Sequence, residues 1–208
     1  MKIKTYDNQD DWLNDRLGRI TGSKLGDLIG KRDGKPKKGY YELIAERVAI
    51  PSNGENAMDR GHRLEDEALQ RFAAETKKKV KTDLVMWFRD DNLDIAISPD
   101  GFIEKKVKGK VQVVEACEVK CLNSANHIEA YLTQKIPKDY DEQVIQYFIV
   151  NDDLKKLYFL FYDPRMPKDF FWLTFTREQL QDDIDSYLTL ERRVLEEVEA
   201  IEKMLTFE

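Results

Sequence analysis

Three polar side chains lie at positions suited to metal-dependent cleavage of a phosphodiester bond. Asp100 is in a Ser-Pro-Asp-Gly turn after a strand-like segment, and Glu118 and Lys120 lie on a later apolar strand. Carboxylate oxygens are hard ligands that suit Mg²⁺, and this ion keeps several waters for a phosphate and a nucleophile. The neighbouring lysine can orient or deprotonate the attacking water, or stabilise charge on the phosphate. The spacing PD-x17-E-x-K is typical of enzymes with this chemistry.

The predicted strand over residues 111–120 carries Glu118 and Lys120 on the same face. Side chains alternate across a strand, so these two share a face with Val114 and Ala116, which are typical of a buried surface. A purely structural ion pair would contribute little net stability there, because desolvation offsets most of the attraction. The pattern therefore favours a functional role for the pair.

Two parts of this pattern have simple structural explanations. Pro, Asp and Gly are common turn residues, so Asp100 alone would indicate only a turn. A second Glu-x-Lys pattern, formed by Glu104 and Lys106, is expected to lie in a lysine-rich turn. We therefore exclude this second pattern from the predicted site.

A third carboxylate, Glu65, is predicted on the inner face of a helix over residues 57–79. At about 100° per residue, Ala68, Leu69 and Phe72 point in nearly the same direction as Glu65. A lone buried carboxylate is costly unless it is paired or bound to a metal. An arginine partner is the structural alternative; otherwise Glu65 joins the acidic residues of the strands around a divalent cation.

The segments that must position these residues follow helical and extended patterns of apolar residues. A final amphipathic helix, rich in acidic residues, is expected at about 177–205, opened by Thr176 and Gln179 in capping-box spacing. The pattern predicts one α/β domain over residues 1–208, with helices around a mixed sheet of about five strands. The other helices are expected at about 10–17, 21–29, 40–49, 57–79 and 140–150, and the strands at 84–88, 93–98, 111–120, 157–162 and 170–175.

The composition of the 208-residue chain excludes several classes of protein. A hydrophobic fraction of 41% with 11% aromatic residues excludes a disordered chain, despite 36% charged residues. Two cysteines exclude a disulfide scaffold, a four-thiolate zinc site and a four-cysteine iron–sulfur cluster. No run approaches the roughly 18 apolar residues of a membrane span, and the first residues lack the apolar stretch of a signal peptide. These features predict a soluble, intracellular protein.

The net charge of −6 is concentrated at the C-terminal end. Residues 176–208 hold 4 basic and 10 acidic residues, whereas residues 1–110 hold 23 basic and 20 acidic residues. Overall acidity argues against a protein that coats nucleic acid non-specifically. A basic run in an expected loop could still form a local groove, or it could be a solvated loop. This run comprises Lys31, Arg32, Lys35, Lys37 and Lys38.

Six ordered blocks of sequence resemble the λ-type exonuclease family, also called the YqaJ-like viral recombinase family. The resemblance extends over about residues 10–175, and the order of the blocks argues against coincidence. The blocks are Trp12-x3-Arg16-Leu17-Gly18-x-Ile20-Thr21-x-Ser23, Gly61-x3-Glu65-x2-Ala68, Ser98-Pro99-Asp100-Gly101, Glu118-Val119-Lys120-Cys121, Tyr140-x2-Gln143 and Tyr162-Asp163-Pro164-Arg165-Met166.

The resemblance implies a restriction-endonuclease-like core of the PD-(D/E)xK superfamily and a Mg²⁺-dependent 5′→3′ exonuclease. Members of the family degrade one strand of linear double-stranded DNA from its 5′ end to 5′-mononucleotides. They leave a 3′ single strand for recombination. The resemblance also implies a homotrimeric ring, a single-strand annealing recombinase as partner, and no association with a membrane. A phage- or prophage-encoded protein acting in the cytoplasm of a bacterial host is the implied setting.

The family's active-site residues carry over onto matching positions of this chain. The resemblance implies Asp100, Glu118 and the main-chain carbonyl of Val119 as metal ligands, with Glu65 serving the second of two Mg²⁺ ions; Mn²⁺ may substitute for Mg²⁺. Lys120 matches the catalytic lysine. A glutamine beside the attacking water matches Gln143. The family often reads Gln-x-Gln here, whereas the second glutamine of this chain is Gln146, so Gln146 is the alternative.

The resemblance further implies a pocket for the 5′-phosphate formed by Arg16, Ser23 and Ser98. A bidentate arginine with nearby hydroxyls suits a terminal phosphate dianion, and anchoring that end sets the register of the next cleavage. Met58 matches an apolar wedge that parts the terminal base pair. The structural alternatives are a surface cation for Arg16 and ordinary core packing for Met58.

Two other functions are compatible with the same acidic residues. A restriction-type endonuclease could use the same metal site, and a non-catalytic module could bind DNA ends with a vestigial acidic cluster.

Cys117 and Cys121 are predicted to be small core residues, with reactive thiols as the alternative. His62 on the helix and His127 in a loop are predicted to be structural or exposed.

Overall fold

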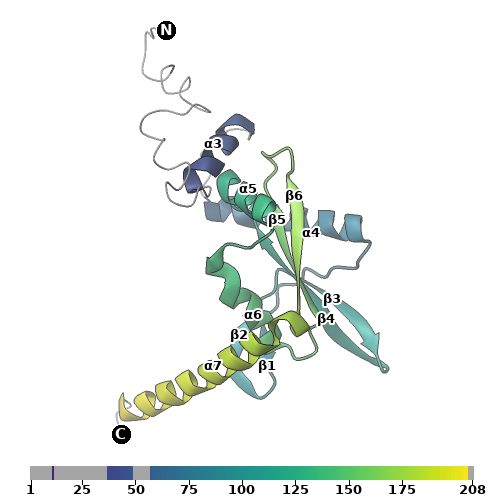
Figure 1. The fold of residues 1–208 in the computed structure, drawn as a ribbon. Coiled ribbons are helices and arrows are strands. Elements are labelled where there is room, and N and C mark those ends of the chain that lie inside the picture. Colours follow the sequence, from purple (N-terminus) through teal and green to yellow (C-terminus); the bar gives the residue numbers. More distant parts are fainter. Residues whose placement is uncertain (1–10, 12–36, 49–56, 206–208) are drawn as a thin grey trace.

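The computed structural model describes residue 11 and residues 37–48 and 57–205. Within these ranges, two helices are followed by four strands, a helical crossover, two further strands and a last helix, and Figure 1 shows their arrangement. The helices are α3 (Lys38–Val48), α4 (Ala57–Thr76), α5 (Ser124–Thr133), a 3₁₀ turn η1 (Lys138–Tyr140), α6 (Asp141–Val150) and α7 (Arg177–Leu205). The strands are β1 (Trp87–Arg89), β2 (Asn92–Ile97), β3 (Gly101–Val107), β4 (Lys110–Lys120), β5 (Lys156–Tyr162) and β6 (Phe170–Thr176).

The described strands form a mixed four-stranded sheet in the order β3-β4-β5-β6 and a separate two-stranded sheet of β1 and β2. The central pair β4–β5 is parallel, while β3–β4 and β5–β6 are antiparallel. Parallel neighbours need a crossover connection, and here α5, η1 and α6 provide it. The predicted mixed α/β architecture is confirmed, with four strands in the central sheet.

Two expectations about the strands are wrong. The predicted strands at 84–88 and 93–98 pair with each other as β1 and β2 and do not join the central sheet. Residues 101–107 form β3, so Glu104 and Lys106 lie on a strand and not in a turn. Because β3 is an edge strand, its second half faces solvent and carries charged residues. These residues interrupt the apolar pattern by which a strand is recognised in the sequence.

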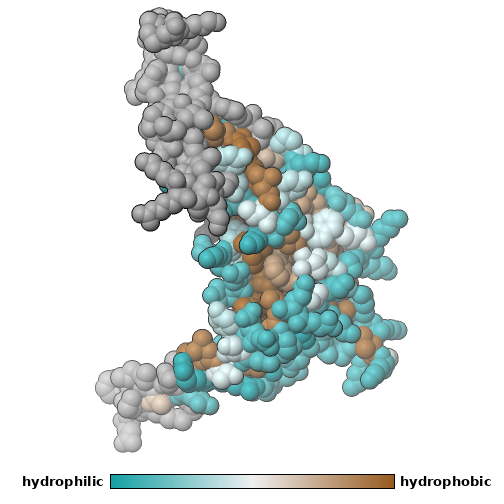
Figure 2. Space-filling view, in the orientation of Figure 1, coloured by the Kyte–Doolittle hydropathy of each residue, from teal (hydrophilic) through white to brown (hydrophobic). Residues whose placement is uncertain are grey.

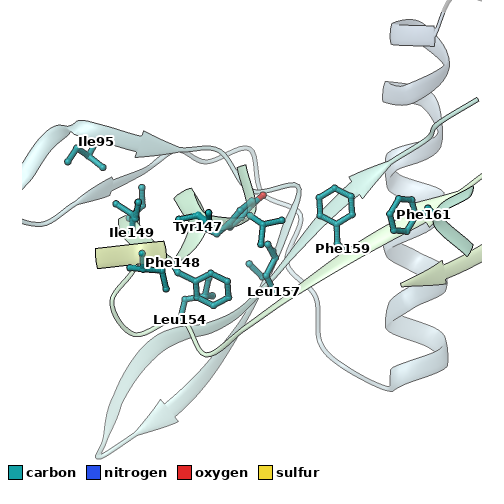
Figure 3. Close-up of a cluster of buried hydrophobic side chains, with 14 residues drawn as sticks. Ile95, Tyr147, Phe148, Ile149, Leu154, Leu157, Phe159 and Phe161 are labelled. Atoms are coloured by element: carbon teal, nitrogen blue, oxygen red, sulfur yellow. The ribbon is translucent and has the colours of Figure 1, made fainter. Parts of the chain in front are cut away.

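Apolar side chains of β5 alternate between two cores on opposite faces of the sheet. Phe159 and Phe161 pack in one cluster with Phe148 of α6, as Figure 3 shows. Leu160 packs in the other cluster with Phe72 of α4. Because β5 is buried on both faces, it appears in the sequence as a nearly continuous apolar run.

The long C-terminal helix α7 has the predicted bounds, Arg177–Leu205. The Thr176 amide donates to the Gln179 side chain at 3.0 Å, which is one half of the predicted capping box. The Arg177 guanidinium donates to the carbonyls of Phe148 and Asn151 and thereby attaches the start of α7 to the end of α6. Figure 1 shows α7 extending away from the sheet toward the C-terminus.

Hydrophilic residues cover much of the surface in Figure 2, and apolar residues gather in a patch that runs from the upper part of that face down to its middle. No helix within the described ranges combines the length and the apolar character needed to cross a lipid bilayer.

Candidate active site

The central strand β4 places Glu118 and Lys120 side by side, as the alternation of side chains predicts. The Lys120 Nζ lies 2.6 Å from the Glu118 Oε1. Glu118 is only 2% exposed, whereas the Lys120 side chain retains 21% exposure. Burial acts to lower the pKa of Lys120, but the charge of Glu118, the hydrogen bond to Glu118 and the charge of Asp100 together raise that pKa above its ordinary value. The strand therefore carries a tight acid–amine pair at one side of a buried surface.

Helix α6 supplies two hydrogen bonds to the same carboxylate. The Gln143 Nε2 donates to Glu118 Oε1 at 2.7 Å, and the Tyr147 hydroxyl donates to Glu118 Oε2. Residues four apart on a helix lie on one face, so a single turn of α6 presents both donors. Burial and the charge of Glu118 raise the pKa of Tyr147, so this hydroxyl keeps its proton.

Asp100 lies next to Glu118 because β3 pairs with β4. Gly101 is opposite Cys117, and the Asp100 Oδ2 accepts a hydrogen bond of 2.7 Å from the Val119 amide. Burial, followed by the charge of Glu118, raises the pKa of Asp100 to about 7, and Glu65 adds to the effect. Because Glu118 and Glu65 both raise the pKa of Asp100, the carboxylate of Asp100 lies within electrostatic range of the other two.

The residue after Asp100 has to be glycine for steric reasons. A Cβ on Gly101 would come within 2.9 Å of the Leu69 and Val80 side chains. Such a separation is shorter than a normal contact, so a larger residue would push β3 away from α4. The glycine thus keeps Asp100 close to β4.

Glu65 is half-buried on α4, at the edge of the predicted core-facing stripe rather than at its middle. The fully buried members of this stripe are Leu64, Ala68, Leu69 and Phe72. The stripe is therefore rotated toward Leu64, which leaves Glu65 partly accessible beside Asp100.

The acidic residues have the donor chemistry of a site for a hard divalent cation. In the described part of the chain, no three His, Cys, Asp or Glu side chains form a ready-made metal-binding group. Hydrogen bonds and the Lys120 ion pair already engage both oxygens of Glu118. The carboxylates of Asp100 and Glu118 nevertheless repel each other, and a cation between them would relieve that repulsion. Together with the main-chain carbonyl of Val119, which follows Glu118 in the sequence, these two carboxylates would hold Mg²⁺, and Glu65 would serve a second ion.

Two tyrosines of this site were not predicted as functional. The Lys120 Nζ lies 4.7 Å from the centroid of the Tyr140 ring. The Tyr147 hydroxyl donates to Glu118 one helical turn after Gln143. Tyr140 entered the prediction only as part of a sequence block. The spacing of Tyr147, four residues after Gln143, is the signal that could have identified it.

The structure distinguishes between the two candidate glutamines. Gln143 contacts Glu118, whereas the Gln146 amide lies 3.5 Å from the Ala96 carbonyl of β2. Ser98 is exposed in the loop that leads to Asp100. The remaining predicted DNA-binding residues are not placed: Arg16 and Ser23 lie outside the described residues, and α4 contains Met58 without a described side chain.

Of the predicted basic run, the described residues Lys37 and Lys38 are exposed, and the other three lie outside the described ranges.

The cysteines and the described histidine have structural surroundings. Cys117 is fully buried, and burial raises the pKa of its thiol, as expected for a core residue. Cys121 is partly buried and packs at the edge of the α4 core. His127 lies on α5 and not in a loop, is 1% exposed, and contacts the Lys168 carbonyl at 2.8 Å. Helix α5 was missed, although its N-cap, Asn123, is a typical capping residue.

The chain is similar to a known protein family and to solved structures of an exonuclease. The profile of the YqaJ-like viral recombinase domain matches residues 11–153. An alkaline exonuclease from Laribacter hongkongensis is similar in structure, with 26% sequence identity and a TM-score of 0.57 over 94% of this chain and 97% of that chain. Its complex with dAMP gives 25% identity and a TM-score of 0.56 over the same shares. No curated protein matches the sequence.

The domain profile extends over more than half of the chain and includes α4, β4 and α6, which carry residues of the site, and β3, which follows Asp100. The domain match and the structural likeness together support a nuclease of the λ-exonuclease type. This chain belongs to the YqaJ-like viral recombinase family.

Proposed function

We propose that this protein is a Mg²⁺-dependent 5′→3′ exonuclease that degrades one strand of linear double-stranded DNA to 5′-mononucleotides. The observation that carries the proposal is the Glu118–Lys120 pair on β4, with Asp100 bonded to the Val119 amide between them. A structural role explains this cluster poorly, because a buried ion pair and a nearby second carboxylate add little stability.

Each residue of the site has a distinct role in the proposed reaction. Asp100, Glu118 and the Val119 carbonyl would hold the metal. When bound, Mg²⁺ would polarise the phosphate and make a coordinated water more acidic. Lys120 would stabilise the negative charge that develops on the phosphate, and Gln143 would orient the attacking water.

The likeness to the alkaline exonuclease supports the choice of product. That enzyme has been solved with dAMP, a nucleoside monophosphate. A mononucleotide product requires cleavage at a chain end, and a pocket for the terminal 5′-phosphate would impose this position. We infer that Arg16, Ser23 and Ser98 form this pocket and that Met58 parts the terminal base pair.

The resemblance to the family supports a proposal for assembly and partner. We infer a homotrimeric ring that surrounds the DNA and passes the 3′ single strand to a single-strand annealing recombinase. The proposed setting is the cytoplasm of a bacterial host that carries the phage or prophage gene.

Linear and closed circular duplexes, each with and without Mg²⁺, test the proposed function. The linear duplex carries distinguishable labels at its 5′ and 3′ ends. We expect early release of the 5′ label as mononucleotide in Mg²⁺, intact circles, and no release in EDTA. Cleaved circles would indicate an endonuclease, and binding of ends without digestion would indicate a non-catalytic module; either result contradicts the proposal.

A further inference from the structure

We propose that Tyr147 is a positioning residue that holds Glu118 in the orientation required by a divalent cation. The inference depends on the proposed function, because it concerns the same carboxylate. Two groups, Gln143 and Lys120, share Glu118 Oε1 at 2.7 and 2.6 Å. The Tyr147 hydroxyl donates a hydrogen bond to the other oxygen, Oε2.

The phenol of Tyr147 is a fixed donor because its ring cannot move freely. The residue is 0% exposed, and Figure 3 shows its ring among the apolar side chains of the α6 core. The Trp87 ring meets it edge to face, with 6.2 Å between centroids and an interplanar angle of 90°. Close packing on all sides therefore determines where the hydroxyl lies, and the hydroxyl determines the rotation of the Glu118 carboxylate.

This arrangement assigns different tasks to the two oxygens of Glu118. A neutral donor on Oε2 preserves the negative charge of the carboxylate while preventing its rotation. Lys120 is the charged partner of Oε1, and its side chain remains 21% exposed. Oε1 is therefore the oxygen that can exchange an ammonium for a divalent cation. Outer partners of metal ligands typically change metal affinity by roughly 10- to 100-fold when removed.

The chain contains a matched control for this interaction. Tyr158 of β5 donates to Glu115 Oε2 at 3.1 Å, and Glu115 is also a buried carboxylate of β4 that pairs with lysine side chains. Glu115 and Glu118 lie on opposite faces of the strand. Tyr158→Phe thus removes the same kind of hydrogen bond without contacting the proposed metal site.

The test measures Mn²⁺ binding to the metal-free protein by the electron paramagnetic resonance signal of free Mn²⁺. We expect Tyr147→Phe to weaken Mn²⁺ binding at least about tenfold and Tyr158→Phe to change it less than about twofold. Thermal unfolding in EDTA should show a similar loss of stability in both variants, because each loses one hydrogen bond to a buried carboxylate. Unchanged Mn²⁺ binding in Tyr147→Phe would overturn the proposal, as would a wild-type protein that binds no Mn²⁺.

Tyr147→Met also lacks a donor, and the same criterion applies to it if Tyr147→Phe does not fold. Digestion of linear DNA over a range of Mg²⁺ concentrations separates this inference from the proposed function. A shifted Mn²⁺ affinity without digestion by the wild type would contradict only the proposed function. Digestion by the wild type, with an unchanged Mn²⁺ affinity in the folded Tyr147 variant, would contradict only the role of Tyr147.

Discussion

At the scale of single residues, the Glu118–Lys120 pair depends on its neighbours for its geometry. A buried carboxylate and a partly buried ammonium lose much of their hydration, so each needs partners of fixed position. Tyr147 and Gln143 hold the carboxylate, and the Tyr140 ring faces the ammonium. The reactivity of the pair therefore depends on three residues of the segment that crosses from β4 to β5.

The contact between Lys120 and the Tyr140 ring gives a prediction at this scale. A cation–π contact contributes roughly 0.5–2 kcal/mol, so its loss should slow digestion by about 2- to 30-fold. We expect this slowing for Tyr140→Leu in single-turnover release of the 5′ label at saturating Mg²⁺. Tyr131→Leu is the control, because Tyr131 packs on Phe171. A wild-type rate in Tyr140→Leu would show that the ring does not position the lysine.

At the scale of secondary-structure elements, the sequence was sufficient for those with a strong apolar period. The bounds of α7 follow from the helical spacing of its apolar residues and from its N-terminal cap. The shared face of Glu118 and Lys120 follows from the alternation of side chains along β4. By contrast, β3 was missed because Glu104, Lys105 and Lys106 interrupt its apolar pattern. The fold accommodates these charged residues because β3 is an edge strand, with only β4 beside it in the four-stranded sheet. The contact of Tyr147 with Glu118 joins residues far apart in the sequence, so the spacing of Tyr147 from Gln143 could mark it as a candidate but could not identify its partner.

Glu115 joins several of these elements and makes their association dependent on pH. Its carboxylate on β4 pairs with Lys78, which follows α4, and with Lys105 of β3. Although burial acts in the opposite direction, these hydrogen bonds lower the pKa of Glu115 from its usual 4.5 to about 2. A carboxylate with a lowered pKa in the folded state stabilises the fold above its unfolded pKa, and this contribution is lost as pH falls toward the folded value.

Urea unfolding at a series of pH values tests this contribution in the wild type and in Glu115→Gln. We expect the wild type to exceed the variant in free energy of unfolding near pH 7 by at most roughly 3 kcal/mol. The difference should narrow between about pH 5 and pH 2, because only the wild type must protonate a paired carboxylate. A difference that stays constant over this range would contradict the role assigned to Glu115.

At the scale of the whole molecule, charge and shape separate the acidic end from the candidate site. Residues 176–208 hold 10 of the acidic residues, and Figure 1 shows their helix α7 extending away from the sheet. An ion pair of 2.6 Å between Arg192 and Asp91 attaches this helix to the β1–β2 turn. DNA is repelled by such an acidic surface, so we expect it to approach the site along other faces.

In the proposed function, the acid–amine pair on β4 performs metal-dependent cleavage of DNA. The most direct measurement is release of a 5′ label from linear duplex DNA in Mg²⁺ by the wild type, Lys120→Ala and Lys105→Ala. Lys105 is a matched control because it also pairs with a buried glutamate of β4, Glu115. We predict digestion by the wild type and by Lys105→Ala, and none above the EDTA background by a folded Lys120→Ala. Digestion by Lys120→Ala at the wild-type rate would contradict the account.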